Sequence, residues 1–363
     1  MSMAVPMHQF TSDNRSRVCP EAWAALEAAN ADSDSPSYGD DRWTRRAADL
    51  IRQTFEADCD VYFVFTGTAA NSLALASLCQ SYHSVICHEF SHIETDECGA
   101  PEFFSNGTKL LLAPGAGGKL SPSSIESIVS RRSDIHYPKP RVLSLTQATE
   151  LGTVYTPAEL GEFSAHSKRL GLRIHLDGAR FGNAVASLKC SPADLSWKSG
   201  IDVLCLGGTK TGMLACEAII FFDRSLSEEF AYRCKQSGQL ASKMRYLAAQ
   251  WVGMLETGAW LTRAAHANAM ALRLEGRLRL LQDKSAHAPT ILFPVQANSV
   301  FVLLSANQLE QLRKRGWEIY TFIGGGARLM CSWETTAQDI DRLMGDIESL
   351  IKPYSDDCKE ISL

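Results

Sequence analysis

The feature that most constrains the fold is a repeated alternation of short apolar runs with longer amphipathic segments between residues 61 and 222. The runs have the length and composition of buried strands and cover residues 61–65, 84–88, 108–113, 141–146, 172–176, 202–206 and 218–222. Helical patterns at 69–80, 121–132 and 156–170 fall between them. Such alternation is typical of a mostly parallel sheet covered by helices. The sequence therefore predicts an α/β fold for this part of the chain.

The segments on either side have a different character. Two helices are predicted at 20–29 and 41–57, and residues 239–281 contain no proline and read as nearly all helical. The tail alternates again, with strands predicted at 299–304, 317–322 and 327–333 and helices at 307–314 and 336–352. We therefore expect four parts, namely an N-terminal arm (1–15), a large α/β domain (16–238), connecting helices (239–285) and a small α+β C-terminal domain (286–363).

Composition excludes some classes of protein. The 363 residues include 36 Lys+Arg against 41 Asp+Glu, a balance that argues against nucleic-acid binding. The 11 cysteines are odd in number and form no CxxC pair, which is typical of reduced thiols in a cytoplasmic protein. No segment resembles a secretory signal or a membrane span, so we expect neither.

The first candidate site feature is the segment 65–71 (FTGTAAN), where an apolar strand runs through small residues into a helix. The free N–H groups and the dipole at a helix start favour an anion. Gly67 lets the backbone approach a ligand, and Thr68 adds a hydroxyl donor. An ordinary helix start capped by threonine has the same pattern, so both interpretations stay open for this segment alone.

The second feature is the segment 174–180 (IHLDGAR), which places Asp177 at the end of an apolar strand. In open α/β sheets, ligands bind outside the carboxyl ends of the strands. A carboxylate there is the partner that keeps a pyridinium nitrogen protonated. Arg180 is suited to binding a carboxylate or a phenolic oxygen. A solvated turn with a surface ion pair is the alternative.

The third feature is the segment 204–212 (LCLGGTKTG), in which small residues after an apolar strand enclose Lys210. A lysine in a dry pocket or beside another cation loses its proton more easily and becomes a nucleophile for an aldehyde. A surface lysine in a flexible loop is the alternative. Each of the three features alone can arise by chance. Their order, with an anion-binding turn, then an Asp and then a Lys about thirty residues later, is much less expected by chance than any one of them.

In this combination the motifs resemble those of the L-threonine aldolases, which are pyridoxal-phosphate (PLP) enzymes of the aspartate-aminotransferase-like superfamily. The resemblance runs over essentially the whole chain and is strongest to the bacterial low-specificity branch. The matching segments are FTSDN at 10–14, YGDD at 38–41, TGTAAN at 66–71, DGAR at 177–180 and GTK at 208–210. The fold implied is fold type I, with a large PLP-binding lobe and a small C-terminal lobe.

The resemblance also implies roles for single residues around the cofactor. Lys210 would hold PLP as a Schiff base, and Asp177 would pair with the pyridine nitrogen. Gly67 and Thr68 would bind the phosphate. His92 would stack on the ring and count among the catalytic residues.

The resemblance also implies which residues bind the substrate and which residue reaches a neighbouring subunit. Arg180 and Arg328 match the family arginines that bind the substrate α-carboxylate, and Ser12 matches a serine that also contacts it. Arg180 also faces the cofactor in this scheme. Lys235 matches a residue that reaches the phosphate in a neighbouring subunit, which implies active sites shared within dimers and a homotetramer built from them.

One departure from the family concerns the base that accepts the proton of the substrate hydroxyl. Some relatives carry a Thr-His-Asn segment there, whereas residues 146–152 of this chain (TQATELG) contain no histidine. His92, Glu97 and a bound water remain candidates. A metal ion bound by His88 and His92 is not expected, because neighbouring cysteines and acids lack the spacing of a zinc site.

The activity implied is retro-aldol cleavage of L-threonine and related β-hydroxy-α-amino acids, phenylserine-like ones included, to glycine and an aldehyde. Another PLP-dependent lyase activity, β-elimination, is the nearest alternative. A transaminase would need a pocket for a second carboxylate, for which no residue stands out. A non-catalytic scaffold on the same fold would tolerate the loss of Lys210 or Asp177, and both are present.

Overall fold

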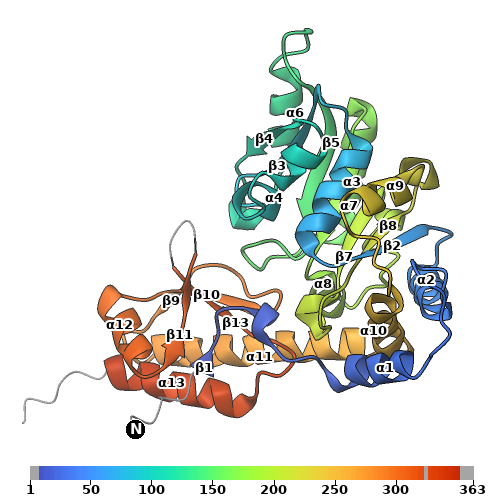
Figure 1. The fold of residues 1–363 in the computed structure, drawn as a ribbon. Coiled ribbons are helices and arrows are strands. Elements are labelled where there is room, and N and C mark those ends of the chain that lie inside the picture. Colours follow the sequence, from blue (N-terminus) through green and yellow to red (C-terminus); the bar gives the residue numbers. More distant parts are fainter. Residues whose placement is uncertain (1–7, 323–325, 352–363) are drawn as a thin grey trace, which may run out of the picture.

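The computed structural model describes residues 8–322 and 326–351 (Figure 1). Its main sheet has seven strands in the order β2-β8-β7-β6-β5-β3-β4. The strands are β2 (Asp60–Val64), β3 (His83–His88), β4 (Lys109–Ala113), β5 (Lys139–Thr146), β6 (Arg173–Gly178), β7 (Val203–Gly207) and β8 (Glu217–Phe221). Only β8 runs antiparallel to its neighbours within this sheet. All seven predicted strands are present, so the predicted mostly parallel α/β fold is confirmed.

Helices cover both faces of this sheet, and alternate residues of the central strands point into two different cores. Val203 and Cys205 of β7 pack in the same core as Leu73 of α3 (Gly67–Leu78). Leu204 and Leu206 pack in the other core, which α7 (Pro157–Leu170) and α8 (Phe181–Leu188) help to build. Burial on both faces explains why the strands read as continuous apolar runs.

The starts and ends of the covering helices follow local sequence signals, as α7 illustrates. Thr156 accepts a hydrogen bond from the backbone N–H of Glu159, and the Glu159 carboxylate accepts one from the N–H of Thr156. Pro157 occupies the first helical position, and Gly171 ends the helix with a φ of 70°. This arrangement is a capping box followed by a left-handed glycine cap.

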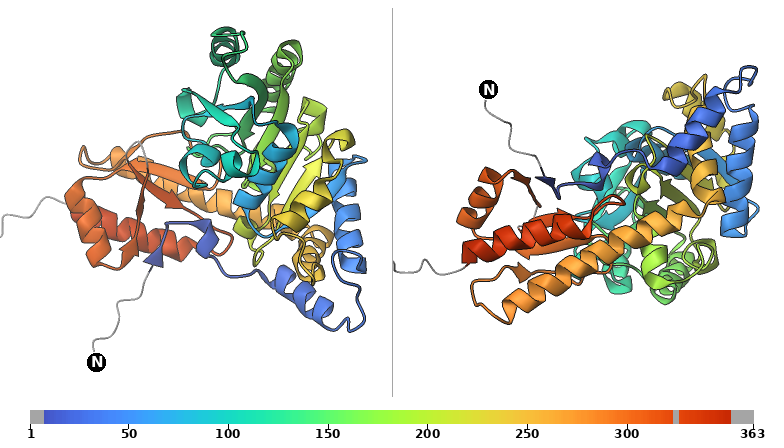
Figure 2. Two further views of the ribbon diagram at one scale, coloured as in Figure 1. Left: turned by 45° about the horizontal axis from the view of Figure 1, so that its top comes forward. Right: turned by 90° about the horizontal axis from the view of Figure 1, so that it is seen from below.

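A 24-residue helix, α11 (Ala259–Gln282), connects the two lobes of the molecule (Figures 1 and 2). Trp260 near its start belongs to the core of the large lobe, whereas Leu274 and Leu278 belong to the core of the small lobe. The preceding helix, α10 (Arg245–Glu256), packs on α1 (Pro20–Asn30) and α2 (Arg42–Phe55). Residues 239–281, predicted to be nearly all helical, form two helices, of which the first begins at Arg245 and the second begins after Gly258, whose φ is 71°.

The small lobe contains a four-stranded sheet in the order β12-β13-β10-β9. Its elements are β9 (Thr290–Ile291), β10 (Ser299–Leu303), α12 (Ala306–Lys314), β12 (Tyr320–Thr321), β13 (Ala327–Met330) and α13 (Ala337–Ile351). The single strand predicted at 317–322 is wrong. Its first half forms β11 (Trp317–Glu318), which pairs with β1 (His8–Gln9) of the N-terminal arm. Its second half forms β12, which pairs with β13. The segment therefore forms two short strands that belong to different sheets. The predicted helix 336–352 ends outside the described residues.

The three segments singled out in the sequence meet at one edge of the large sheet. The segment 65–71 follows β2, 177–180 ends β6, and 207–212 follows β7. β6 and β7 are neighbours, with Asp177 opposite Cys205 in the register. This edge is where ligands bind in such sheets. Among the described helices, none is long and apolar enough to cross a bilayer.

Gly207 makes a close backbone contact at this edge and gives a test of the packing. A Cβ atom at this position would lie 2.3 Å from the carbonyl oxygen of Ala179. We expect Gly207→Ala to lower the free energy of unfolding by about 1–3 kcal/mol or more, because backbone cannot move aside as a side chain would. Urea denaturation measures this change.

The matched control is Gly161→Ala in α7, where an added Cβ would meet no atom within 4 Å. That substitution should stabilise the protein by about 0.5–1 kcal/mol, since alanine favours a helix interior over glycine. Equal stability changes in the two variants would contradict the close approach of β7 to the turn after β6.

Candidate active site

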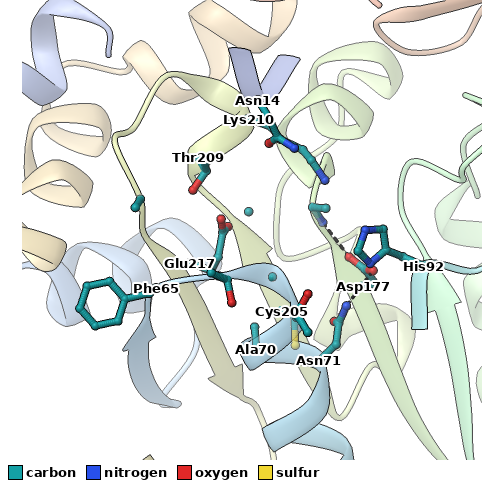
Figure 3. Close-up of a pocket in the computed structure, with 16 residues that line it drawn as sticks. Asn14, Phe65, Ala70, Asn71, His92, Asp177, Cys205, Thr209, Lys210 and Glu217 are labelled. Atoms are coloured by element: carbon teal, nitrogen blue, oxygen red, sulfur yellow. Dashed lines mark hydrogen bonds between the residues drawn. The ribbon is translucent and has the colours of Figure 1, made fainter. Parts of the chain in front are cut away.

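A cavity of about 300 Å³ opens at the carboxyl ends of β2, β6 and β7 (Figure 3). The residues that line it come from all three sequence segments and include Gly67, Thr68, Asn71, Asp177, Thr209 and Lys210. In Figure 3, His92, Asp177 and Asn71 lie on one side of the cavity, and Thr209 and Glu217 lie on the other. The sheet thus brings together the candidate residues that the sequence separates by more than a hundred positions.

Asp177 is held in place by two donors. Its Oδ2 accepts a hydrogen bond of 3.0 Å from the Asn71 side chain, and its Oδ1 accepts one of 3.0 Å from the Ala179 N–H. The carboxylate is buried. Two hydrogen bonds fix the direction of this carboxylate. This geometry suits a carboxylate that faces a cationic ring nitrogen.

Lys210 follows β7 and reaches the same cavity. Its ammonium makes no hydrogen bond or ion pair with any residue in the described part of the chain, although it lies in a site with several acids. Burial, followed by the charge of Arg180, lowers the pKa of Lys210 from its ordinary value. A lysine without a partner and with a lowered pKa is a nucleophile for a carbonyl carbon.

The turn before α3 provides the anion-binding side of the cavity. Thr66 caps the helix, and its hydroxyl accepts a hydrogen bond from the Ala69 N–H. Gly67 and Thr68 form the first turn of this 12-residue helix and line the cavity. A Cβ at Gly67 would meet no atom within 4 Å, so the backbone here borders open space. A helix start of this kind attracts a phosphate group.

His92 is the first residue of the short helix α4 (His92–Thr95), and its side chain is hydrogen-bonded to a buried acid. Its Nδ1 lies 2.8 Å from Oε1 of the buried Glu97, which also accepts a hydrogen bond from Asn71. The hydrogen bond with Glu97 raises the pKa of His92. Burial raises the pKa of Glu97. Glu97 does not line the cavity, so it orients His92 and Asn71 rather than meeting a ligand.

A second cavity, of about 360 Å³, adjoins the first and contains the two arginines. His92, Asp177 and Lys210 line both cavities, so the two form one continuous site. Arg180 lies after β6 in the large lobe, and Arg328 lies in β13 of the small lobe. The site is therefore built between the lobes. Two guanidinium groups in one cavity are suited to binding a carboxylate.

Arg180 is already tied to an acid that the sequence analysis did not single out. Its Nε and Nη2 donate hydrogen bonds of 2.7 and 2.8 Å to the two carboxylate oxygens of Asp13. Asn298 of the small lobe donates a third, of 3.0 Å. Burial alone would raise the pKa of Asp13, but Arg180, Lys210 and Asn298 together more than offset it, so the pKa is lowered. Asp13 thus sets the direction of the Arg180 guanidinium.

Arg328 has fewer partners than Arg180. Its Nη2 donates a hydrogen bond of 2.9 Å to the carbonyl oxygen of Thr11, and its guanidinium stacks on the Tyr320 ring at 4.8 Å. Its Nε is buried and has no partner among the described residues. Burial, followed by the charge of Arg180, lowers the pKa of Arg328 to about 10. A cation with an unused donor in a cavity is suited to an anionic ligand.

The remaining predicted site residues fall into two groups. Ser12 lines the second cavity, where its hydroxyl accepts a hydrogen bond of 3.2 Å from the Asn14 N–H. Lys235 does not reach either cavity, and its ammonium lies 4.7 Å from the centre of the Tyr38 ring. Its predicted role belongs to a neighbouring subunit and stays a prediction.

Two acids at the site were missed by sequence reasoning. Glu217 of β8 lines the first cavity, and its carboxylate accepts a hydrogen bond of 2.7 Å from the Gly208 N–H. Glu150 lies in the loop after β5 and lines the second cavity. Each is an acid next to an apolar segment, and only long-range packing brings it to the site. Glu150 lies in the segment 146–152, whose lack of the family histidine is the one sequence signal that points to it.

The residues present fit a PLP group. The buried Asn71 Oδ1 has no partner in the part of the chain described, and it lies beside the carboxylate that would face a pyridine nitrogen. Gly67 and Thr68 offer a helix start for a phosphate, and Lys210 offers a free amine. Burial raises the pKa of Glu217, which lines the same cavity. Among the described residues, no His, Cys, Asp and Glu side chains cluster in a way that could hold a metal ion.

Comparisons with known proteins place the chain within a class of enzymes. The family model described as "Beta-eliminating lyase" matches residues 9–307. Among solved structures, threonine aldolase from Leishmania major superposes with a TM-score of 0.88 at 28% identity, covering 95% of this chain and all of that one. The family and its structural neighbours are PLP-dependent fold type I enzymes.

Curated relatives narrow the class to a family. The low specificity L-threonine aldolase of a Pseudomonas strain is 61% identical over 346 residues, which is 94% of this chain and 98% of the relative. The protein with the same description from Pseudomonas aeruginosa is 62% identical over 342 residues, or 93% and 96%. This chain belongs to the low-specificity L-threonine aldolase family, which confirms the resemblance inferred from its motifs.

The buried pair of Asp13 and Arg180 gives a test of the site's construction. We expect Asp13→Asn to lower the free energy of unfolding by about 3–5 kcal/mol, because it leaves the Arg180 charge buried without a counter-ion. Chemical denaturation monitored by circular dichroism measures the change.

Glu334→Gln is the control, since Glu334 pairs with Arg17 at 2.8 Å on the surface, where the Arg17 side chain is 85% exposed. Its expected cost is below about 1 kcal/mol. A cost for Asp13→Asn as small as that of the control would show that the buried pair is not needed for the fold.

Proposed function

We propose that this protein is a PLP-dependent aldehyde-lyase that cleaves L-threonine and related β-hydroxy-α-amino acids to glycine and an aldehyde. The observation that carries the proposal is the position of Lys210. Its free amine shares one cavity with the fixed carboxylate of Asp177 and adjoins the arginines Arg180 and Arg328. Family membership supports the type of reaction, and the geometry of the site supports the roles proposed for its residues.

The chain's own residues would hold the cofactor as follows. Gly67 and Thr68 bind its phosphate, Asp177 pairs with its ring nitrogen, His92 stacks on its ring, and Lys210 bonds to its carbonyl carbon. When bound, PLP withdraws electrons from the substrate Cα atom. The lowered pKa of Lys210 supports the release and return of its amine in each turnover.

The substrate would lie in the second cavity, with its carboxylate between Arg180 and Arg328 and near Ser12. Two guanidinium groups fix the carboxylate and thereby the orientation of the three other bonds at Cα. That orientation would decide which of these bonds is presented to the bound cofactor for cleavage, and the proposed reaction requires the Cα–Cβ bond. Asp13 supports this by holding Arg180, and Asn298 holds Asp13.

The organisation of the working enzyme is part of the proposal. We propose the division into arm (1–15), large domain (16–238), connecting helices (239–285) and small domain (286–363), and a homotetramer built from dimers with shared sites. Lys235 would reach the phosphate in a neighbouring subunit, and its exposed position supports this. The ten described cysteines are all free, which supports a cytoplasmic location.

Purified protein with added PLP tests the proposed function. We expect aldehyde release from L-threonine, coupled in equal amounts to glycine, and loss of this activity to background in Lys210→Ala. Lys198→Ala is the control, because Lys198 pairs with Glu56 far from the cavities and should be dispensable. Ammonia and an α-keto acid in place of aldehyde would favour the β-eliminating alternative.

A further inference from the structure

Glu150 lines the second cavity, and one of its two carboxylate oxygens has no hydrogen-bond partner among the residues described. Oε1 of Glu150 accepts a hydrogen bond of 2.9 Å from the N–H of His92. Oε2 is buried and has no hydrogen-bond partner among the residues described. A buried acceptor that is left unpaired costs free energy, so its retention at a ligand cavity indicates a partner supplied by the ligand.

The loop that carries Glu150 is fixed by its own hydrogen bonds. Gln147 exchanges two hydrogen bonds with the backbone of Tyr155, at 2.7 and 2.9 Å. The Thr149 N–H donates to the carbonyl oxygen of Thr153, and the Gly152 N–H donates back to that of Thr149. Both ends of the loop are therefore closed, and Glu150 is held at its tip. A group held in this way is preorganised for a reaction.

The other candidate bases are less suited to the substrate hydroxyl. Glu97 lines neither cavity, and its Oε1 is already used by His92 and Asn71. His92 has its Nδ1 bound to Glu97, and its Nε2 lies 3.4 Å from Asp96. Glu97 also has a buried Oε2 without a partner among the described residues, so Glu150 differs from it in lining the same cavity as Arg180 and Arg328.

We propose that Glu150 is the catalytic residue that accepts the proton of the substrate β-hydroxyl group when the Cα–Cβ bond breaks. The proposal rests on the proposed function. The O–H bond breaks and its proton moves to Oε2 of Glu150. The oxygen's electron pair becomes the second bond of the aldehyde carbonyl, and the Cα–Cβ pair remains on Cα, which is protonated afterwards to give glycine.

The charges around Glu150 support this role. Burial, followed by the charge of Asp177, raises the pKa of Glu150 to about 7. His92 and Arg180 lower the pKa of Glu150 and so oppose this shift. The other charged groups that line the cavity are Lys210, Asp96 and Arg328. A pKa near the working pH lets one carboxyl group accept a proton and release it in the same turnover.

The test compares two reactions of Glu150→Gln holoenzyme. The amide oxygen can still accept the hydrogen bond from His92, so the fold should be kept. Threonine cleavage should fall about 100-fold or more, the usual effect of removing a general base. Exchange of the glycine Cα hydrogen with solvent deuterium, which involves no β-hydroxyl group, should keep most of its rate.

Glu102→Gln is the matched control. Glu102 also has a buried Oε2 without a partner in the described chain, but it lies in α5 (Ala100–Phe104) outside both cavities. It should cleave threonine at the wild-type rate. Unchanged cleavage in Glu150→Gln, or equal losses of cleavage and exchange, would overturn the proposal. A wild-type protein that releases no aldehyde would instead reject the proposed function.

An infrared titration of the protein without PLP provides a readout independent of activity. Wild-type protein should show a protonated carboxyl band that disappears as the pH rises through about 7 and that is missing from Glu150→Gln. In the holoenzyme, the matching rise of kcat with pH should be lost in the variant. A Glu150 carboxyl that stays ionised down to its ordinary pKa of 4.5 contradicts the proposal.

Discussion

The buried ion pair between Asp13 and Arg180 is the interaction on which the site depends. Asp13 comes from the N-terminal arm, Arg180 from the end of β6, and Asn298, which also bonds Asp13, from the small lobe. Three parts of the chain that are far apart in sequence therefore meet at one carboxylate. Because an unpaired charge in this position would be very costly, the pair fixes the distance between the lobes and the cavity between them.

Charge is distributed unevenly along the continuous site that results. Asp177 and Glu217 border the first cavity, whereas Arg180 and Arg328 lie in the second, and Lys210 borders both. Under the proposed function, a cationic ring nitrogen and an anionic substrate carboxylate would be met by opposite charges at opposite ends. Lys210 lies between these ends, where burial and Arg180 keep its amine easy to deprotonate. In the proposed function, substrate orientation and cofactor chemistry would both follow from this one arrangement.

Much of the fold was predictable because its signals are local. Buried strands read as apolar runs, and Asp177 and Lys210 stand at the ends of two of them. Asp13 and Glu150 could not be recognised in this way, because their importance arises from contacts with residues distant in the chain. The division of the segment 317–322 between two sheets has the same cause, since the N-terminal arm competes for its first half.

The central claim, that Lys210 is the residue that bonds PLP, is tested most directly by borohydride reduction and peptide mapping. Reduction of the C=N bond fixes the cofactor to its lysine, and mass spectrometry of the digest identifies the position. The predicted result is a single modified peptide with pyridoxyl phosphate on Lys210, next to Thr209 and Thr211. Modification of another lysine instead, or none with L-threonine cleavage intact, would contradict the claim.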